Sequence, residues 1–348
     1  LATVTKEPLG VVAAVVPWNY PLEMAIWKLA PALATGNSVI LKPAEDSPLS
    51  SLRLAELAAE AGLPDGVLSV VPGAGPVVGK ALGTHHGVDV VTFTGSTETG
   101  RQFQLYAGQS NLKQVWIEAG GKSAAVVLDD VTDFDAVAAG IAGGIFTNTG
   151  QVCSATSRLV VQRGVAEEII DRVVARAESL VVGDPLDPAT EMGPVVSERQ
   201  ASRVVELMQL GATEAQRVHG GGVIDLGPVG TFLRPQVLVG VDPQARIAQT
   251  EVFGPVLTVH VVDDVEQAIA VANSTPYALA AGLWTDSLQR AHQVSRRLRA
   301  GTVSVNCVDA LDFSTPFGGF GQSGYGRDLS LHAMDKFTGL KTTWFHHG

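Results

Sequence analysis

The chain has 348 residues, of which 46% are hydrophobic and 17% charged, and its formal net charge is −11. This composition excludes intrinsic disorder, and the length predicts two or more domains. The acidic balance disfavours binding to nucleic acid and to anionic membrane surfaces. No apolar run reaches the roughly 18 to 20 residues of a membrane helix. Two cysteines make no disulfide framework, so we expect a cytoplasmic protein.

Strand-like runs alternate with helical patterns through the first 119 residues. The runs are rich in Val and Ile, as is typical of strands buried on both faces. This alternation predicts an α/β fold with a doubly wound parallel sheet. The expected strands are residues 10–16, 38–42, 67–71 and 88–94, and the expected helices are residues 22–34, 50–61 and 79–82.

A second alternation follows and predicts a second α/β domain, with the seam near residues 119–121. Its expected strands are residues 123–128, 157–162, 256–262, 280–285 and 302–306, and its expected helices are residues 136–148, 165–180 and 200–210.

The stretch Phe93-Thr94-Gly95-Ser96 ends a predicted strand and precedes a helix. Free N–H groups and the helix dipole favour phosphate binding at such a point, although an ordinary capped turn has the same pattern. The glycines at 73–79 are spaced one residue too wide for the dinucleotide fingerprint.

Lys42 and Glu45 follow the second predicted strand. Ligands bind outside the carboxyl ends of strands in open α/β sheets, and a carboxylate there can accept hydrogen bonds from ribose hydroxyls. It would repel a 2′-phosphate and so favours NAD over NADP. The alternative is two solvated charges on a loop.

Asn19 lies between two prolines, and Glu118 precedes the small residues of the predicted seam. A rigid Asn can donate to a developing oxyanion, and a Glu between domains can act as a general base. A turn-forming Asn and a solvated Glu are the alternatives.

Cys153 lies among small residues in the stretch 149–156, TGQVCSAT. A lone cysteine is often an inert core residue, but small neighbours would let a substrate approach it. An oxyanion donor, a carboxylate, a thiol and a phosphate-holding turn together describe acyl chemistry coupled to a dinucleotide. The His and Cys spacing predicts no metal site.

In combination and in this order, the motifs resemble the aldehyde dehydrogenase superfamily. The resemblance runs from residue 7 to residue 342. The motifs are PWN at 17–19, FTGS at 93–96, EAGGK at 118–122, GQVC at 150–153, EVFGP at 251–255 and PFGG at 316–319.

The resemblance implies catalytic roles. Cys153 would be the nucleophile, with Asn19 and the Cys153 backbone N–H as oxyanion donors. Glu118 would activate the hydrolytic water. Lys28 matches a lysine on a proton path, and Asp328 stands where many relatives have a Glu that can help to relay protons.

The resemblance also implies NAD as the cofactor, with NADP less favoured. Lys42 and Glu45 would bind the adenosine ribose, Ser96 the pyrophosphate and Glu251 the nicotinamide ribose. The implied cofactor-binding set is Val16, Trp18, Lys42, Glu45, Gly75, Gly79, Phe93, Gly95, Ser96, Glu251 and Phe253.

The implied reaction oxidises an aldehyde to an acid through a thiohemiacetal and a thioester on Cys153. Relatives that transfer the acyl group to coenzyme A generally lack the Glu at position 118, so hydrolysis is favoured. The implied domains are an NAD-binding domain at 9–119, a catalytic domain at 120–320, a return to the cofactor domain at 321–336, and an oligomerisation arm at 1–8 and 337–348.

The stretches at 116–123, 322–333 and 340–344 resemble gamma-glutamyl-gamma-aminobutyraldehyde dehydrogenases of putrescine breakdown. Another aldehyde or semialdehyde substrate, or a catalytically silent scaffold, remains an alternative. At 320–321 the chain has Phe-Gly, where relatives usually have an aromatic residue followed by Lys. Relatives form homodimers or homotetramers and carry further residues before the position of Leu1, so we expect an incomplete cofactor domain.

Overall fold

A computed structural model describes residues 1–227 and 230–346. Its contacts divide the chain into two compact units. Unit 1 comprises Leu1–Ala119, Leu311–Gly318 and the residues from Gly324 onward, and unit 2 comprises Gly120–Ala310 and Gly319–Ser323. No helix in the described part of the chain is long and apolar enough to cross a membrane.

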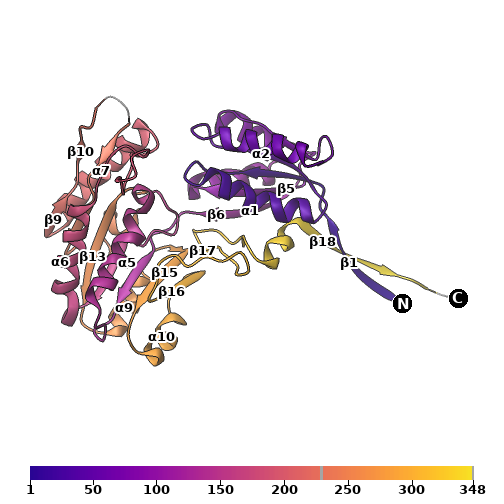
Figure 1. The fold of residues 1–348 in the computed structure, drawn as a ribbon. Helices are drawn as coiled ribbons and strands as arrows, with labels where there is room; N and C mark the ends of the chain where they lie inside the picture. The colour runs from indigo at the N-terminus through magenta and orange to yellow at the C-terminus, as the bar shows by residue number, and fades with distance from the viewer. Residues whose placement is uncertain (228–229, 347–348) are drawn as a thin grey trace. The chain divides into compact units, whose positions relative to one another are not determined.

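Unit 1 is built on a five-stranded parallel sheet in the order β4-β3-β2-β5-β6. Val12 of β2 packs in a buried cluster with Leu29 of α1, whereas its neighbour Ala13 packs in another cluster with Phe103 of α4. Helices therefore cover both faces, which confirms the doubly wound sheet (Figure 1). The strands are β2 (Val11–Val15), β3 (Ser38–Lys42), β4 (Leu68–Val70), β5 (Val90–Gly95) and β6 (Gln114–Ala119), and the helices are α1 (Pro21–Ala34), α2 (Leu49–Glu60), α3 (Lys80–Thr84) and α4 (Thr97–Gly108).

The strand order of unit 1 reverses between β2 and β5. The chain winds from β2 outward through β3 to β4, then returns to β5 on the other side of β2. A crevice at the carboxyl ends of two such strands is where open α/β sheets bind their ligands. Residues that follow β2 and β5 therefore lie at the natural ligand edge of this sheet.

The two ends of unit 1 pair with each other. Strand β1 (Ala2–Pro8) runs antiparallel to β18 (Thr338–Trp344), and a 3₁₀ segment, η3 (Leu331–Phe337), precedes β18 (Figure 1). Large apolar side chains of this ribbon, including Leu340 and Trp344, are exposed. Its use as an oligomerisation arm stays a prediction, and residues 347–348 of the predicted arm lie outside the described residues.

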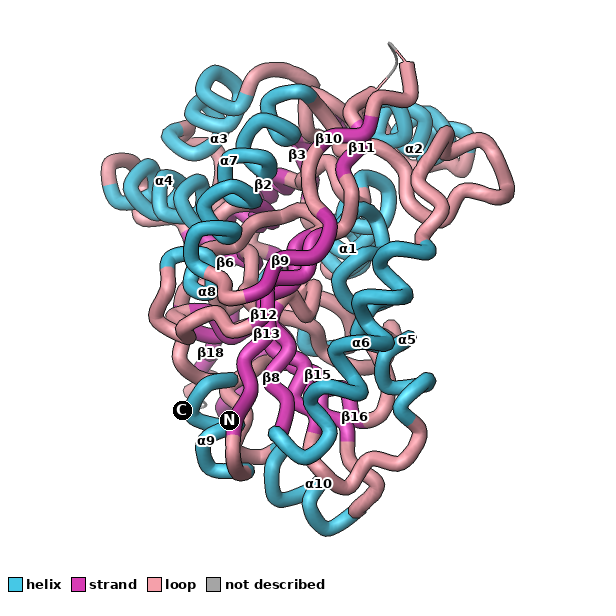
Figure 2. The backbone as a smooth tube through the Cα atoms, turned by 90° about the vertical axis from the view of Figure 1, so that its left-hand side faces the viewer, coloured by secondary structure: helices cyan, strands magenta, loops and turns pink. Residues whose placement is uncertain are grey.

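Unit 2 contains a seven-stranded sheet in the order β16-β15-β7-β8-β13-β12-β9, which is parallel except for β9 (Figure 2). Leu159 of β8 packs with Ile169 of α6, and Val160 packs with Ile269 of α9 on the opposite face. The strands are β7 (Ala124–Val127), β8 (Arg158–Gln162), β9 (Arg217–Gly220), β12 (Gln236–Val239), β13 (Val256–Val262), β15 (Ala280–Trp284) and β16 (Thr302–Val305). The helices are α5 (Phe134–Phe146), α6 (Arg163–Ser179), α7 (Glu198–Glu214), α9 (Val265–Ala272) and α10 (Leu288–Ser295).

Several short elements were not expected from the sequence. A π-helical turn, η1 (Gly75–Gly79), leads directly into α3, so the helix expected at 79–82 begins earlier and ends later. The other short elements are the 3₁₀ turn η2 (Thr147–Gly150), the strands β10 (Val223–Ile224), β11 (Phe232–Leu233), β14 (Tyr277–Ala278) and β17 (Phe320–Gly321), and the helix α8 (Arg246–Gln249).

The boundary of the returning segment differs from the sequence expectation of 321–336. The chain rejoins unit 1 at Leu311, where the ring of Phe317 packs edge-on against Trp27 at 5.5 Å between centroids. It then re-enters unit 2 at Gly319–Ser323, because β17 pairs with β14 and the Ser323 hydroxyl donates to the Gly120 carbonyl at 2.8 Å. Local pairing therefore divides this segment between the two units.

Candidate active site

The turn that carries Cys153 begins where α5 ends. Asn148 and Thr149 have positive φ angles of 50° and 60°, which residues other than glycine rarely adopt, and the expected helix at 136–148 therefore stops at Phe146. Gly150 also has a positive φ, and a Cβ there would lie 2.2 Å from the Gly254 carbonyl oxygen. Glycine is required at this position.

Hydrogen bonds hold the turn on both sides. The Gln151 side chain donates to the Asn148 carbonyl and accepts from the Val196 N–H, both at 3.0 Å. The Thr149 hydroxyl donates to the Gly193 carbonyl at 3.0 Å. Cys153 is partly buried and is not in a disulfide. The thiol is thus carried by a constrained turn among small residues.

Gly121 and the hydrogen bond between Ser154 and Asp309 form part of the surroundings of Cys153 in unit 2. A Cβ on Gly121 would lie 2.8 Å from the Cys153 carbonyl oxygen, so a side chain at 121 would push the turn away. The Ser154 hydroxyl donates to the Asp309 carboxylate at 2.9 Å. Burial raises the pKa of Asp309, and the bond from Ser154 opposes this rise. An acidic group therefore lies one residue from the predicted nucleophile.

Glu118 lies at the end of β6 in a buried cluster of charges within unit 1. Its carboxylate accepts a hydrogen bond from the Thr94 hydroxyl of β5 at 3.1 Å and lies 3.9 Å from the ammonium of Lys28 of α1. Lys28 in turn donates to Asp328, and so does Lys336 of η3. We call Lys28, Glu118, Asp328 and Lys336 the charge quartet. Each of its members is at most 2% exposed.

The two carboxyls of the charge quartet differ in pKa. Burial raises the pKa of Glu118 to about 7, and the nearby Asp328 adds to this rise, while Lys28 and the Thr94 hydroxyl oppose it. Burial would also raise the pKa of Asp328, but Lys28 and Lys336 more than offset that effect and hold it well below its usual range. Asp328 is therefore the permanent anion and Glu118 the carboxyl that titrates near neutral pH.

The residues predicted at the end of β2 lie at the ligand edge of unit 1. Val16 is buried, and its N–H donates to the Lys42 carbonyl at 3.1 Å, which ties the end of β2 to β3. Trp18 and Asn19 follow in a partly buried loop that leads into α1, whose first residue is Pro21. The fixed φ angle of proline suits the first position of a helix, so Pro21 favours the start of α1 directly after this loop.

The predicted phosphate turn follows β5 at the same edge. Ser96 is the N-cap of α4, and its hydroxyl accepts from the Thr99 N–H at 3.2 Å. A Cβ on Gly95 would lie 2.6 Å from the ring of Phe93, so the strand can turn into the helix there only with a small residue. The N-terminus of α4 is thus formed at the switch point between β2 and β5.

Lys42 and Glu45 come together at the end of β3. Their side chains lie 3.3 Å apart, and the Glu45 carboxylate also accepts from the Gly75 N–H at the start of η1. Partial burial opposes ionisation of Glu45, but backbone N–H groups, including that of Gly75, and the Lys42 charge lower its pKa. Glu45 is half-exposed and ionised, which fits a group that accepts hydrogen bonds from ribose hydroxyls. Gly79 is buried at the end of η1.

Glu251 and Phe253 lie in unit 2. The Glu251 carboxylate accepts from the Gly121 N–H at 3.2 Å, and burial raises its pKa to about 7 despite that bond and the Arg203 charge. Phe253 has a positive φ of 57°, and its carbonyl accepts from the Gln200 side chain at 2.8 Å. Both residues are thereby fixed in a short loop before β13.

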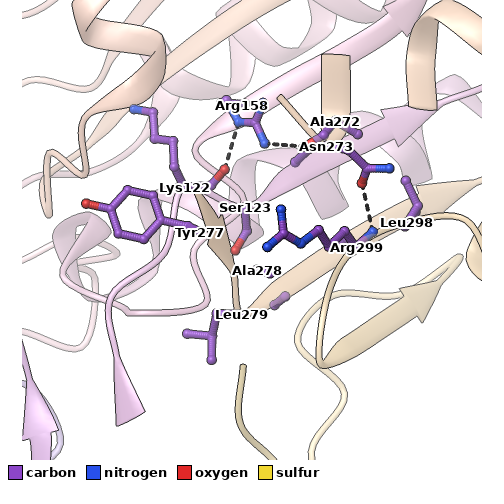
Figure 3. A pocket seen from close by; sticks show the side chains of 13 residues that line it. Lys122, Ser123, Arg158, Ala272, Asn273, Tyr277, Ala278, Leu279, Leu298 and Arg299 are labelled. Atoms are coloured by element: carbon purple, nitrogen blue, oxygen red, sulfur yellow. Dashed lines mark hydrogen bonds between the residues drawn. The ribbon is translucent and has the colours of Figure 1, made fainter. Parts of the chain in front are cut away.

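A pocket in unit 2 is lined by the buried residues Lys122 and Arg158 (Figure 3). Arg158 donates to the carbonyls of Lys122, Val271 and Ala272 at 2.6–2.8 Å. The Lys122 side chain runs away from Arg158, and its ammonium nitrogen has no hydrogen-bond partner among the described residues. Burial and the Arg158 charge lower the pKa of Lys122 to about 7, while Glu251 opposes this.

The structure thus brings Glu118, Lys28 and Asp328 together in unit 1, as it does Lys42, Glu45 and Gly75, whereas Cys153, Glu251 and Phe253 lie in unit 2. Sequence reasoning missed Lys336 and Asp309. A lysine is usually exposed, so nothing in the stretch Asp335-Lys336-Phe337 indicates burial. Among the described residues, no three His, Cys, Asp or Glu side chains are arranged to bind a metal ion.

Comparison with known proteins identifies the family. The aldehyde dehydrogenase family model matches residues 1–343. This chain belongs to the aldehyde dehydrogenase family. Its members are NAD(P)-dependent oxidoreductases that act on aldehydes, and the resemblance seen in the sequence is confirmed.

Three similar proteins illustrate the relationship. The NADP/NAD-dependent aldehyde dehydrogenase PuuC of Escherichia coli is 50% identical over 344 residues, which are 99% of this chain and 69% of PuuC. The structure of indole-3-acetaldehyde dehydrogenase AldA of P. syringae with NAD⁺ is 51% identical, with a TM-score of 0.97 over 99% of this chain and 70% of that one. The gamma-glutamyl-gamma-aminobutyraldehyde dehydrogenase structure from Burkholderia cenocepacia is 52% identical, with a TM-score of 0.96 over 99% and 69%.

Proposed function

We propose that this aldehyde dehydrogenase oxidises an aminoaldehyde, such as gamma-glutamyl-gamma-aminobutyraldehyde, to its carboxylic acid with NAD. Cys153 attacks the aldehyde carbon, and the resulting thiohemiacetal is oxidised to a thioester. NAD supplies the hydride acceptor when it is bound. Asn19 and the backbone N–H of Cys153 donate to the oxyanion. A cytoplasmic homodimer or homotetramer, associated through β1 and β18, is part of the same proposal.

The observation that carries this proposal is the buried Glu118 with its raised pKa of about 7. A base is most effective when its pKa lies near the working pH, and one that titrates near 7 suits activation of water in a cell. The Glu118 carboxylate takes a proton from water as the water oxygen bonds to the thioester carbon. The carbon–sulfur bond then breaks, the acid leaves, and the Cys153 thiolate is restored.

The residues at the carboxyl edge of unit 1 fit a dinucleotide. The switch point between β2 and β5 carries Val16, Trp18 and the N-terminus of α4, and Ser96 caps that helix. The half-exposed, ionised Glu45 would accept hydrogen bonds from the adenosine ribose, and its charge disfavours a 2′-phosphate. These features support NAD over NADP. Glu251 would hold the nicotinamide ribose through its carboxylate.

Asp309 supports a cationic or strongly polar substrate. Its carboxylate accepts from Ser154, the residue after Cys153, so an acidic group is bonded to the turn that carries the reacting thiol. A charged amine on the substrate would gain from this carboxylate, whereas a simple alkyl aldehyde would not. The similar B. cenocepacia protein is a gamma-glutamyl-gamma-aminobutyraldehyde dehydrogenase, and this polar aldehyde belongs to the same substrate class.

The test is aldehyde-dependent reduction of NAD by the purified chain, with propionaldehyde and gamma-aminobutyraldehyde as substrates. We expect the aminoaldehyde to have the higher kcat/KM and Cys153→Ala to abolish turnover. Cys307→Ala is the matched control, because Cys307 is exposed and should leave the rate unchanged. Turnover that survives in Cys153→Ala, or an inactive parent chain, would refute the proposal.

Substrate preference is tested by Asp309→Asn. Loss of one charge contact should lower kcat/KM for the aminoaldehyde about tenfold and leave propionaldehyde nearly unchanged. Asp312→Asn is the control, because Asp312 is exposed and its carboxylate accepts from the nearby Ser314. An equal loss for both substrates would mean that Asp309 supports the turn rather than selecting the substrate.

A further inference from the structure

Lys336 is a buried cation that the proposed mechanism does not use. It is 2% exposed, it donates to Asp328, and its ammonium lies 5.3 Å from the centre of the Phe337 ring. Burial lowers the pKa of Lys336 to about 8, and the Asp328 charge opposes that shift. A buried ammonium without a partner destabilises the fold, and Asp328 is the partner that Lys336 has here.

The charges of the quartet balance only when both lysines are present. Lys28 and Lys336 supply two positive charges, and Glu118 and Asp328 supply two negative charges when both are ionised. With Lys336 neutral or absent, two carboxylates would share one cation. The carboxyl with the weaker contacts would then keep its proton, and that carboxyl is Glu118, which lies 3.9 Å from Lys28.

The groups that face Asp328 come from several elements. Lys28 projects from α1, Glu118 from β6, and Lys336 from η3, while Thr94 of β5 reaches the cluster through its bond to Glu118. Glu118 also has a side-chain hydrogen bond with Asp328, which contributes to the rise in the Glu118 pKa. The nearby Asp335 is exposed and pairs instead with Lys6 at the surface.

We propose that Lys336 is a positioning residue for hydrolysis of the thioester: it neutralises Asp328 together with Lys28 and thereby allows Glu118 to ionise near neutral pH. The inference rests on the proposed role of Glu118 as the base. Lys336 touches neither substrate nor cofactor in this account, and it acts through Asp328. The alternative is that Lys336 only fastens η3 to the core of unit 1.

The first test is the pH dependence of kcat in Lys336→Met. Removal of the positive charge should raise the pKa of Glu118, so the acidic limb of the profile should move to higher pH by about one unit. At a pH below the midpoint, kcat should then fall about tenfold. Lys336→Arg should restore the wild-type limb. Lys341→Met is the matched control, because Lys341 is exposed and pairs with Glu7 at the surface. A lower kcat with an unshifted limb in Lys336→Met would overturn the proposal.

A double variant separates charge balance from folding. In Asp328→Asn/Lys336→Met the paired charges leave together, so Glu118 again faces one cation, Lys28. The acidic limb should return toward that of the wild type, because no uncompensated carboxylate remains. If Lys336 only supported the fold, replacing Asp328 as well would not restore the wild-type pH profile of kcat. A double variant with the limb of the single variant would contradict the account.

Infrared titration reads the same property without turnover. A protonated buried carboxyl has its own C=O stretching band, and the band that Glu118→Gln removes belongs to Glu118. In Lys336→Met this band should persist to a pH about one unit higher than in the parent chain. An unshifted band would refute the role of Lys336 even if the chain proved inactive. An inactive chain with a shifted band would instead refute only the proposed function.

Discussion

The two units bury their charges in different ways. In unit 1, Lys28 and Lys336 both donate to the Asp328 carboxylate, and Glu118 lies beside Lys28. In unit 2, Arg158 donates to backbone carbonyls, and the Lys122 ammonium has no hydrogen-bond partner among the described residues.

The buried charges of unit 1 are paired in a way that can support proton transfer, whereas the buried amine of unit 2 has no such pairing in the described part of the chain. Charges of both signs are fixed beside Glu118 in Lys28 and Asp328, so Glu118 can gain or lose a proton although it is buried. A lone buried amine instead loses its proton, as the lowered pKa of Lys122 indicates. Substitutions in the two units should therefore have effects of different kinds.

The largest expected effect belongs to Glu118→Gln. Without the base, hydrolysis of the thioester should slow by about 10²- to 10³-fold, while formation of the thioester persists. Rapid-mixing measurements should show one rapid burst of reduced NAD per active chain followed by slow turnover. Equal loss of the burst and the steady rate would mean that Glu118 acts before the thioester forms.

A second substitution, Lys28→Met, tests the paired cluster through stability. It leaves two carboxyls with one cation in a buried site, which should lower the free energy of unfolding by about 3 to 5 kcal/mol. Denaturant unfolding of the variant beside Lys6→Met, an exposed lysine of the same unit, measures this. A variant as stable as the control would mean that the quartet contributes nothing to the fold.

The opposite and smaller effect is expected for Lys122→Met. The unfolded lysine has a pKa of about 10.4, whereas the folded one has a pKa of about 7, so the unfolded state binds more protons between these values. Stability of the parent chain should therefore rise with pH across this window. Lys122→Met lacks this dependence and should be more stable than the parent at pH 7 by about 1 to 4 kcal/mol. A destabilised variant at pH 7 would show that Lys122 does have a favourable partner.

Periodicity made much of the fold predictable. The Val- and Ile-rich runs at β2, β5, β8 and β13 predict buried parallel strands, and these strands form both central sheets. The edge strand β9 was missed because its sequence, Arg-Val-His-Gly, is short and polar. Strands β1 and β18 pair with each other across the length of the chain, a contact that no local pattern indicates, and only the family resemblance grouped residues 1–8 with 337–348.

The candidate site was predictable where a motif carries it and not where tertiary packing creates it. Cys153 and Glu118 lie in recognisable stretches, and the positions of Lys28 and Asp328 followed from the family resemblance. Lys336 and Asp309 are ordinary charged residues in the sequence. Folding gives them importance, because Lys336 is buried against Asp328 and the loop after β16 brings Asp309 to Ser154.

The measurement that tests the central claim most directly is the mass of Glu118→Gln after incubation with NAD and gamma-aminobutyraldehyde, followed by peptide mapping. The account predicts that an acyl group accumulates on Cys153 and that Cys307 stays unmodified, because hydrolysis is blocked after the thioester forms. An acyl group on Cys307, or the absence of any adduct while NAD is reduced, would contradict it.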